Sequence, residues 1–175
     1  VVRSGQSDDG SIKLVLKLED VKEIETVIIK ENKRTTLCVS TQVGCAQACC
    51  FCATGRMGLL RNLTAGEIVG QFVAAQKYVR EASPSGIEDP ISNVVFMGMG
   101  EPLDNVSEVI DATRIFTDSH GISIAPRRIT ISTAGHAEGL QKLIDSRLKV
   151  SLAFSLHHPR DRERSKILPI NRRFP

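Results

Sequence analysis

All five cysteines of this 175-residue chain lie within fifteen positions, from Cys38 to Cys52. Three of them, Cys45, Cys49 and Cys52, have the spacing C-x3-C-x2-C, with Phe51 directly before the last. Three thiolates on one short loop can hold three corners of an iron–sulfur cube. The fourth iron then stays open for a ligand that is not protein. The spacing therefore predicts a loop folded around a metal cluster, and the rest of the chain must support that loop.

A structural zinc site is the alternative, with Cys38 or His157 as the fourth ligand. Such sites usually combine two closely spaced pairs from separate loops. This chain has one such loop and no partner pair, so the pattern favours the iron–sulfur interpretation. No secretory signal precedes the cysteines, because V-V-R-S-G-Q-S-D-D-G has no apolar core. Clustered cysteines without a signal indicate a reducing compartment, so we expect a cytoplasmic protein, or an organellar one in a eukaryote.

The composition is that of a soluble globular domain, with 41% apolar and 25% charged residues. A formal net charge of +3 permits a polyanionic partner without requiring one. No apolar run approaches the roughly 18 residues that would span a bilayer, so no membrane association is expected. The chain begins without Met and ends on I-N-R-R-F-P. We therefore expect it to be a piece of a longer protein.

Strand and helix patterns alternate along the chain. Three β-rich runs come first, and the turn E-N-K joins the second to the third. Capping boxes T-A-G-E and N-V-S-E then open two amphipathic helices. The expected strands are 11–18, 25–30, 34–40, 93–97, 128–132 and 149–156, and the expected helices are 64–82, 105–116, 137–146 and the turn 161–167, with the loop S-P-S-G-I-E-D-P after residue 82. This alternation predicts an α/β fold with a parallel sheet, open or closed.

Loops that leave the carboxyl ends of parallel strands carry the chemistry of such folds. Four polar or reactive loops occupy those positions here, and we expect them on one rim of the sheet. They are the cysteine loop, G-M-G-E-P at 98–102, S-T-A-G at 132–135 and S-L-H-H at 155–158.

The stretch from Cys45 to Cys52 resembles the C-x3-C-x-Φ-C signature of the radical S-adenosylmethionine (SAM) superfamily, in which Φ is aromatic. The resemblance implies a 4Fe-4S cluster bound by Cys45, Cys49 and Cys52, with SAM chelating the open iron. It also implies that one electron, supplied by a donor such as flavodoxin, cleaves SAM to a 5′-deoxyadenosyl radical. Cys50 directly follows one ligand and is not expected to join them.

The G-M-G-E-P loop resembles the G-G-E-P-type loop of the same superfamily. The resemblance implies that Gly100 lets the backbone approach SAM closely and that Glu101 binds the methionyl ammonium. The alternative interpretations, which do not use the resemblance, are a glycine-rich strand-to-helix turn for this loop and a surface histidine for His157. The remaining contacts to the SAM carboxylate and ribose are expected from Ser132, Ser155, Leu156 and His157.

Five stretches, in unchanged order over residues 12–171, resemble the RlmN/Cfr family of RNA adenosine methyltransferases: L-C-V-S-T-Q-V-G-C, R-N-L-T, V-F-M-G-M-G-E-P, T-I-S-T and I-L-P-I-N. RlmN-type members methylate C2 of an adenosine in 23S rRNA, and in bacteria also of a tRNA adenosine beside the anticodon. Cfr-type members methylate C8 of the same rRNA adenosine. The residues do not distinguish these two, and a zinc-stabilised RNA-binding module without catalysis is a third alternative.

In the family mechanism, a cysteine near the carboxyl end carries the methyl group, and a second cysteine resolves the protein–RNA adduct with formation of a disulfide bond. Cys38, seven residues before Cys45, matches the resolving cysteine. Glu25 matches the family's proton acceptor. A buried strand cysteine and a solvated glutamate are the alternatives. Because no cysteine follows Cys52, the methyl-carrying residue is absent, and we expect this chain to bind cluster and SAM without methylating RNA.

The resemblance also implies the architecture: a partial (β/α) barrel of the radical SAM type, preceded by a small antiparallel β extension. We expect residues 1–35 to form that extension and a linker to a missing accessory domain, and residues 36–175 a truncated core. Basic stretches at 30–34, 127–128, 160–166 and 172–173 are expected to be solvated faces. Any contact that they make with RNA would be to phosphate and strongly salt-sensitive.

Overall fold

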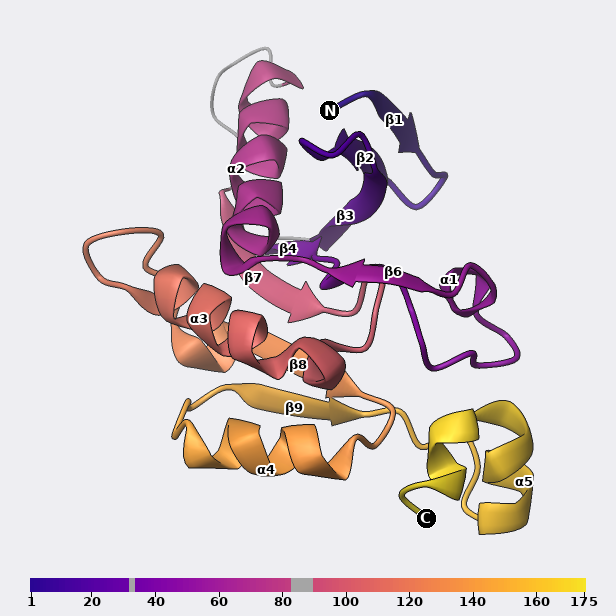
Figure 1. The fold of residues 1–175 in the computed structure, drawn as a ribbon. Helices are drawn as coiled ribbons and strands as arrows, with labels where there is room; N and C mark the ends of the chain where they lie inside the picture. Colours follow the sequence, from indigo (N-terminus) through magenta and orange to yellow (C-terminus); the bar gives the residue numbers. More distant parts are fainter. Residues whose placement is uncertain (32–33, 83–89) are drawn as a thin grey trace.

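The computed structural model describes residues 1–31, 34–82 and 90–175 (Figure 1). Apart from Glu31 and Pro90, the predicted E-N-K turn and S-P-S-G-I-E-D-P loop lie outside these residues. Within the described chain, the main sheet has the order β1-β2-β3-β4-β7-β8-β9. Its strands are β1 (Arg3–Gln6), β2 (Ile12–Lys17), β3 (Glu23–Glu31), β4 (Arg34–Cys38), β7 (Ile91–Phe96), β8 (Ile129–Thr133) and β9 (Ser151–Phe154).

The sheet changes from antiparallel to parallel at β4. Strands β1 to β4 pair antiparallel, and β4, β7, β8 and β9 pair parallel. The predicted α/β fold with an antiparallel start is confirmed. Strand β1 was not expected, because R-S-G-Q is exposed at every position and so carries no apolar alternation.

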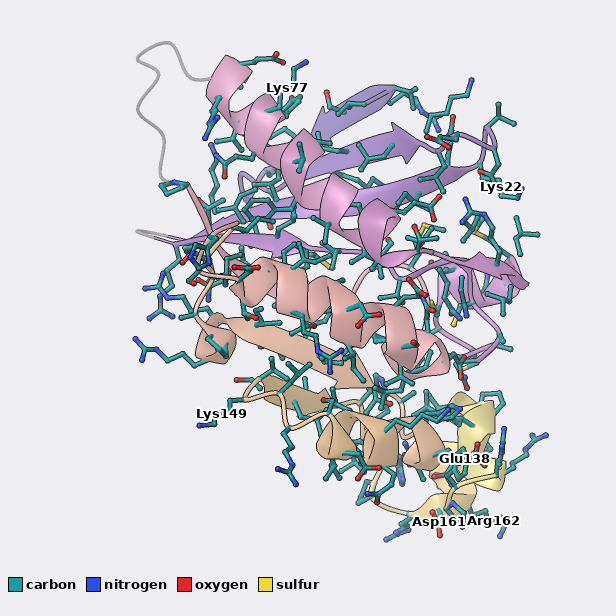
Figure 2. All side chains as sticks on the ribbon, turned by 60° about the vertical axis from the view of Figure 1, so that its left-hand side comes forward. Lys22, Lys77, Glu138, Lys149, Asp161 and Arg162 are labelled. Carbon is teal, nitrogen blue, oxygen red and sulfur yellow. The ribbon has the colours of Figure 1, made fainter. Side chains whose placement is uncertain are left out.

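Three helices cover one face of this sheet: α2 (Ala65–Ala82), α3 (Val106–Thr117) and α4 (Ala137–Asp145) (Figure 2). The strands alternate between buried residues and half-buried ones, as a sheet covered on one face requires. Under the helices, Phe96 and Phe116 pack edge to face with ring centroids 6.2 Å apart. The other face carries Glu25, Cys38 and Ser132, all half-buried.

The antiparallel and parallel parts share one hydrophobic core. Leu14 and Ile28 from the first strands belong to the same buried cluster as Leu37, Val94 and Ile131. The β extension therefore continues the core sheet. The boundary at residue 35 stays a prediction. No helix among the described residues is both long and apolar enough to cross a membrane.

The cysteine loop is an insertion in a small hairpin of β5 (Gln42–Gly44) and β6 (Leu59–Asn62), and it contains the short helix α1 (Ala53–Arg56). The Cys45 amide donates to the Gly58 carbonyl over 3.0 Å and closes the loop. Gly44 has φ +78°, and a Cβ there would lie 1.8 Å from the Gly58 oxygen. Only glycine therefore fits at this closure.

The remaining elements are α5 (Asp161–Ile167) and three 3₁₀ turns, η1 (Pro102–Asn105), η2 (Pro126–Arg128) and η3 (Pro169–Arg172). Figure 1 shows α1 and α5 at the end of the sheet toward which the arrowheads of β7, β8 and β9 point. The cysteine loop thus lies at the carboxyl ends of the parallel strands, as predicted.

The first predicted capping box is confirmed and the second is wrong. The Thr64 amide donates to the Glu67 carboxylate (2.9 Å), and the Glu67 amide donates to the Thr64 hydroxyl (3.2 Å). Asn105 makes no capping bond. Its side-chain amide instead donates to the carbonyls of Thr41 and Leu63, and Glu108 accepts from the Ala65 amide of α2. Buried carbonyls are almost always hydrogen-bonded, and Asn105 supplies the donor for these two. Its side chain is therefore not free to form the predicted capping box.

Candidate active site

A cavity of about 350 Å³ opens at the carboxyl ends of β7, β8 and β9. All four predicted loops contribute to its wall, so the expectation of a common rim is confirmed. Eight of the predicted site residues line it: Cys45, Cys49, Cys52, Gly100, Glu101, Ser132, Ser155 and His157. Leu156, Cys38 and Glu25 are not among the lining residues.

The thiols of the cysteine motif reach this cavity from different depths. Cys45 is buried and its sulfur accepts from the Gln47 amide at 3.5 Å, while Cys49 and Cys52 are half-buried. Cys50 is exposed, and its amide donates to the Ile167 carbonyl of α5 over 3.1 Å. Among the described residues, no three Cys, His, Asp or Glu side chains already stand as a closed metal-binding group.

Burial dominates the acid–base behaviour of these thiols. Burial, with smaller contributions from the neighbouring Cys49, Asp104 and Glu101, raises the pKa of Cys45 to about 11. Burial also raises the pKa of Cys49. At neutral pH both groups are thiols in the metal-free protein. A metal ligand must be a thiolate, so metal binding at this loop releases protons.

The glycines of G-M-G-E-P are needed for packing against the chain segment that leads into the cysteine loop. A Cβ on Gly98 would lie 2.7 Å from the Ser40 hydroxyl and 2.8 Å from the Val39 carbonyl. Gly100 has φ +101°, and its Cβ would lie 2.6 Å from Gln42. We expected these glycines to admit a ligand. In the structure both glycines line the cavity, and the absence of a side chain also allows their close packing against Ser40 and Gln42.

Glu101 is buried, with 4% of its surface exposed. One carboxylate oxygen accepts from the Leu103 amide (3.1 Å) and the other from the Ala134 amide (2.8 Å). Burial raises its pKa despite these bonds. The side chain thus joins the β7 loop to the β8 loop. Each oxygen can accept a second hydrogen bond, so the predicted contact with an ammonium group stays compatible with this geometry.

The predicted contacts on the β8 and β9 loops have different surroundings. The Ser132 hydroxyl donates to the Phe96 carbonyl over 2.6 Å and is therefore already engaged. Ser155 donates its amide to the Thr133 carbonyl and lines the cavity. The His157 ring lies against Phe51 of the cysteine loop, with centroids 4.6 Å apart. Leu156 is 48% exposed. Its carbonyl accepts from Arg164.

A side-chain network that the sequence did not indicate ties the cysteine loop to both neighbouring loops. The Gln47 amide donates to one oxygen of Asp104 over 2.6 Å. His136 Nδ1 accepts from the Gly139 amide (2.9 Å), so in the neutral ring the proton is on Nε2. That nitrogen lies 3.2 Å from the other Asp104 oxygen. Asp104 therefore receives one donor from the cysteine loop and one from the β8 loop.

Cys38 and Glu25 lie on the uncovered face of the sheet, beyond the cavity wall. Cys38 pairs with Val27, two residues from Glu25 on β3, so both side chains share that face. Burial raises the pKa of Cys38 to about 11. Glu25 is half-exposed and its carboxylate lies 3.2 Å from Lys13. Glu25 lines a neighbouring cavity of about 230 Å³, and Thr54 lines both cavities.

Comparison with known proteins decides the family. Residues 39–174, more than half of the chain, match the model described as the radical SAM superfamily. The chain belongs to the radical SAM superfamily. Radical SAM methyltransferases use a 4Fe-4S cluster and SAM, and membership favours the cluster over the zinc alternative.

Two relatives are similar over the whole chain. A probable dual-specificity RNA methyltransferase RlmN from Syntrophomonas wolfei is 44% identical over 179 residues, which cover 100% of this chain and 50% of that protein. The crystal structure of a radical SAM methyltransferase from Sphaerobacter thermophilus has 47% identity and a TM-score of 0.91, and the match covers 99% of this chain and 50% of that one. The chain thus spans about half the length of both relatives.

Proposed function

We propose that this chain is the cluster- and SAM-binding core of an RlmN-type RNA methyltransferase. One observation carries the proposal: all three cysteines of the motif open into a single cavity with residues from three further carboxyl-end loops. The donor set fits a site-differentiated cluster, because three thiols share one loop, whereas Cys50 is exposed and does not line the cavity. The similarity to a probable dual-specificity RNA methyltransferase supports the choice of reaction.

Each residue has a distinct role in this proposal. Cys45, Cys49 and Cys52 hold the cluster, which supplies the electron that cleaves SAM. Glu101 accepts from the ammonium group of SAM with its remaining lone pairs. Ser155 and His157, both at the cavity, contact the rest of the molecule. Gly100 lines the cavity as a backbone contact, and Ser132 can only accept a bond there because its hydroxyl already donates to Phe96. The contact predicted for Leu156, which does not line the cavity, stays a prediction.

Cys38 and Glu25 would act later, on the RNA adduct. Cys38 is a thiol at neutral pH because of its raised pKa, so it needs a base before it can form a disulfide. Glu25 shares its face of the sheet and offers a half-exposed carboxylate. A carboxylate and a thiol on the same face of the sheet suit the resolution step that the family resemblance assigns to this pair.

The substrate we propose is an adenosine of 23S rRNA, modified at C2, and a tRNA adenosine beside the anticodon. The term dual-specificity in the name of the Syntrophomonas relative favours two RNA substrates. C8 methylation of the Cfr type is the second candidate. An electron donor such as flavodoxin and a cytoplasmic location complete the proposal, and the five free cysteines fit a reducing compartment.

Adjacent cysteines provide a matched test. We expect the anaerobically reconstituted protein to be brown, with iron and sulfide in near-equal amounts. Cys49→Ser should lose most of the iron, because it removes one corner of the cluster. Cys50→Ser, one position later, should retain it. Absorbance, iron and sulfide analysis and SAM binding are measured on the same samples.

A colourless protein that binds one zinc would overturn the proposal. So would equal iron loss in Cys49→Ser and Cys50→Ser. The RNA part is tested separately by binding at two salt concentrations. Phosphate contacts predict a steep loss of affinity with salt, and a salt-independent affinity would contradict them.

A further inference from the structure

Arg164 of α5 is a buried cation that contacts two residues of the cavity wall, Ala134 and Phe154. The run R-D-R-E-R-S-K was expected to be a solvated face, and for Arg164 that prediction is wrong: only 5% of its surface is exposed. Within the described residues its hydrogen-bond acceptors are neutral oxygens. They belong to the Ala134 carbonyl, the Leu156 carbonyl and the Asn171 side chain. Burying a guanidinium costs free energy that these bonds must offset.

The three acceptors come from three different segments of the chain, and one of them, Ala134, lines the cavity. Nη2 donates to Ala134 of the β8 loop over 2.6 Å, and Nε donates to Leu156 of the β9 loop over 3.1 Å. Nη1 donates to Asn171 of η3. The guanidinium plane also lies 5.2 Å from the ring centroid of Phe154. One rigid, planar fork therefore sets the spacing between two loops that carry predicted SAM contacts.

Neighbouring residues are adapted to this guanidinium. Gly135 has φ +108°, and a Cβ there would lie 3.2 Å from Nη2 of Arg164 and 3.3 Å from the Phe154 ring. Asn171 is 1% exposed, and its side-chain amide donates in turn to Asp161 and Ser165 of α5. These bonds fix the Asn171 oxygen as the acceptor for Arg164.

Ala134 is held between two buried charged groups. Its amide donates to the Glu101 carboxylate over 2.8 Å, and its carbonyl accepts from Arg164 over 2.6 Å. Glu101 and Arg164 thus bind the amide and the carbonyl of the same residue, from opposite sides of its backbone. Ala134 itself lines the cavity. The position of this wall residue depends on both charges.

The α5 end of the arrangement also contacts the cysteine loop. The Cys50 amide donates to Ile167, and Cys49 packs against the buried cluster of Ala134, Leu168 and Ile170. The Leu168 amide donates back to the Arg164 carbonyl over 2.8 Å. Arg164 is therefore linked to the β8 loop, the β9 loop and the cysteine loop at once.

We propose that Arg164 is the positioning residue that holds the β8 and β9 loops in the arrangement that binds SAM. This inference rests on the proposed function, because it assumes that the cavity binds SAM. It assigns no contact between Arg164 and the ligand. Two substitutions separate geometry from charge. Arg164→Gln removes the charge and the fork, whereas Arg164→Lys keeps the charge but presents a single ammonium group.

The test measures SAM binding to the reconstituted protein by equilibrium dialysis, with iron content determined in the same samples. We expect the Kd for SAM to rise about tenfold in Arg164→Gln and by a similar factor in Arg164→Lys, with iron content unchanged. The SAM-induced change in the electron paramagnetic resonance spectrum of the reduced cluster should need correspondingly more SAM. Arg162→Gln, an exposed arginine on the same helix (Figure 2), is the matched control and should bind like the wild type.

Unchanged SAM affinity in Arg164→Gln would overturn the positioning role, and so would full rescue by Arg164→Lys. If Arg164→Gln does not fold, the lysine variant alone decides, because it keeps the buried charge and the aliphatic stem. A wild-type protein with full iron that binds no SAM would instead overturn the proposed function. The two failures are therefore distinguishable.

Discussion

Asp104 shows how much one side chain contributes at the rim of the cavity. Its two oxygens accept from Gln47 and His136, which belong to different loops. In Asp104→Asn only one oxygen remains, so one of the two donors loses its acceptor. We expect the free energy of unfolding to fall by about 1–3 kcal/mol. We also expect slower uptake of iron by the cysteine loop during reconstitution.

Chemical denaturation and the time course of iron incorporation measure the two effects. Asp111→Asn is the control, because Asp111 is exposed and, among the described residues, pairs only with Arg114 on its own helix. It should change both quantities little. Equal behaviour of the two variants would show that Asp104 does not position the cysteine loop.

At the residue scale, the sequence indicates groups whose partners are close along the chain. The spacing of Cys45, Cys49 and Cys52 is local, so it predicts a common loop directly. Arg164 and Asp104 are different, because each has a partner on a loop 30 or more residues away, and only the tertiary fold brings the two together. A charged residue within R-D-R-E-R-S-K looks solvated until the β8 and β9 loops are placed over it.

At the element scale, Gln71 of α2 fixes the segment between β4 and the cysteine loop. It is 1% exposed, and its amide makes two bonds with the backbone of Ser40: it accepts from the amide and donates to the carbonyl, both over 2.8 Å. Ser40 in turn donates its hydroxyl to the Glu25 carbonyl and accepts from the Met99 amide. A helix side chain thus completes hydrogen bonds that a neighbouring strand would otherwise supply.

Gln71→Leu should lower the free energy of unfolding by about 2–4 kcal/mol, since it leaves two buried backbone groups of Ser40 without partners. Gln141→Leu on α4 is the control: Gln141 is exposed and, in the part of the chain that the structure describes, bonds only to Asp145, so its loss should cost under about 0.5 kcal/mol. Urea denaturation of both variants measures the difference. A cost for Gln71→Leu no larger than the control would contradict this role.

The elements themselves were predictable where their apolar period was regular. The structure has helix α2 at Ala65–Ala82, and the pattern predicted 64–82. Strand β9 is shorter than predicted, and at its carboxyl end the Leu156 carbonyl bonds to Arg164 and not to a neighbouring strand. The hairpin of β5 and β6 went unnoticed, since Q-V-G is too short for periodicity and its pairing spans the whole cysteine loop.

At the scale of the whole molecule, one ion-pair cluster joins the β extension to the core. Arg61 of β6 donates to Asp20, in the turn between β2 and β3, and to both oxygens of Glu67 at the start of α2. These bonds lower the pKa of Glu67 and of Asp20 and raise that of Arg61. The β extension, the cysteine hairpin and the first helix therefore share one electrostatic contact.

This contact predicts a pH-dependent stability. A carboxyl group whose pKa is lowered by folding stabilises the folded protein above its unfolded pKa of about 4, and the stabilisation disappears as pH falls through the folded value. At pH 7, Arg61→Met should be less stable than the wild type by about 1–2 kcal/mol, mainly through the Glu67 bonds. The gap should narrow below about pH 4, as Glu67 and then Asp20 become protonated.

Urea denaturation at several values between pH 7 and pH 3 gives the gap directly. Arg114→Met is the matched control, because the Arg114–Asp111 pair is exposed and lies within one helix. Its gap should be small at every pH. If the Arg61→Met gap stayed constant down to pH 3, the carboxylates would not be its source. The packing of the Arg61 stem would then be what joins the β extension to the core.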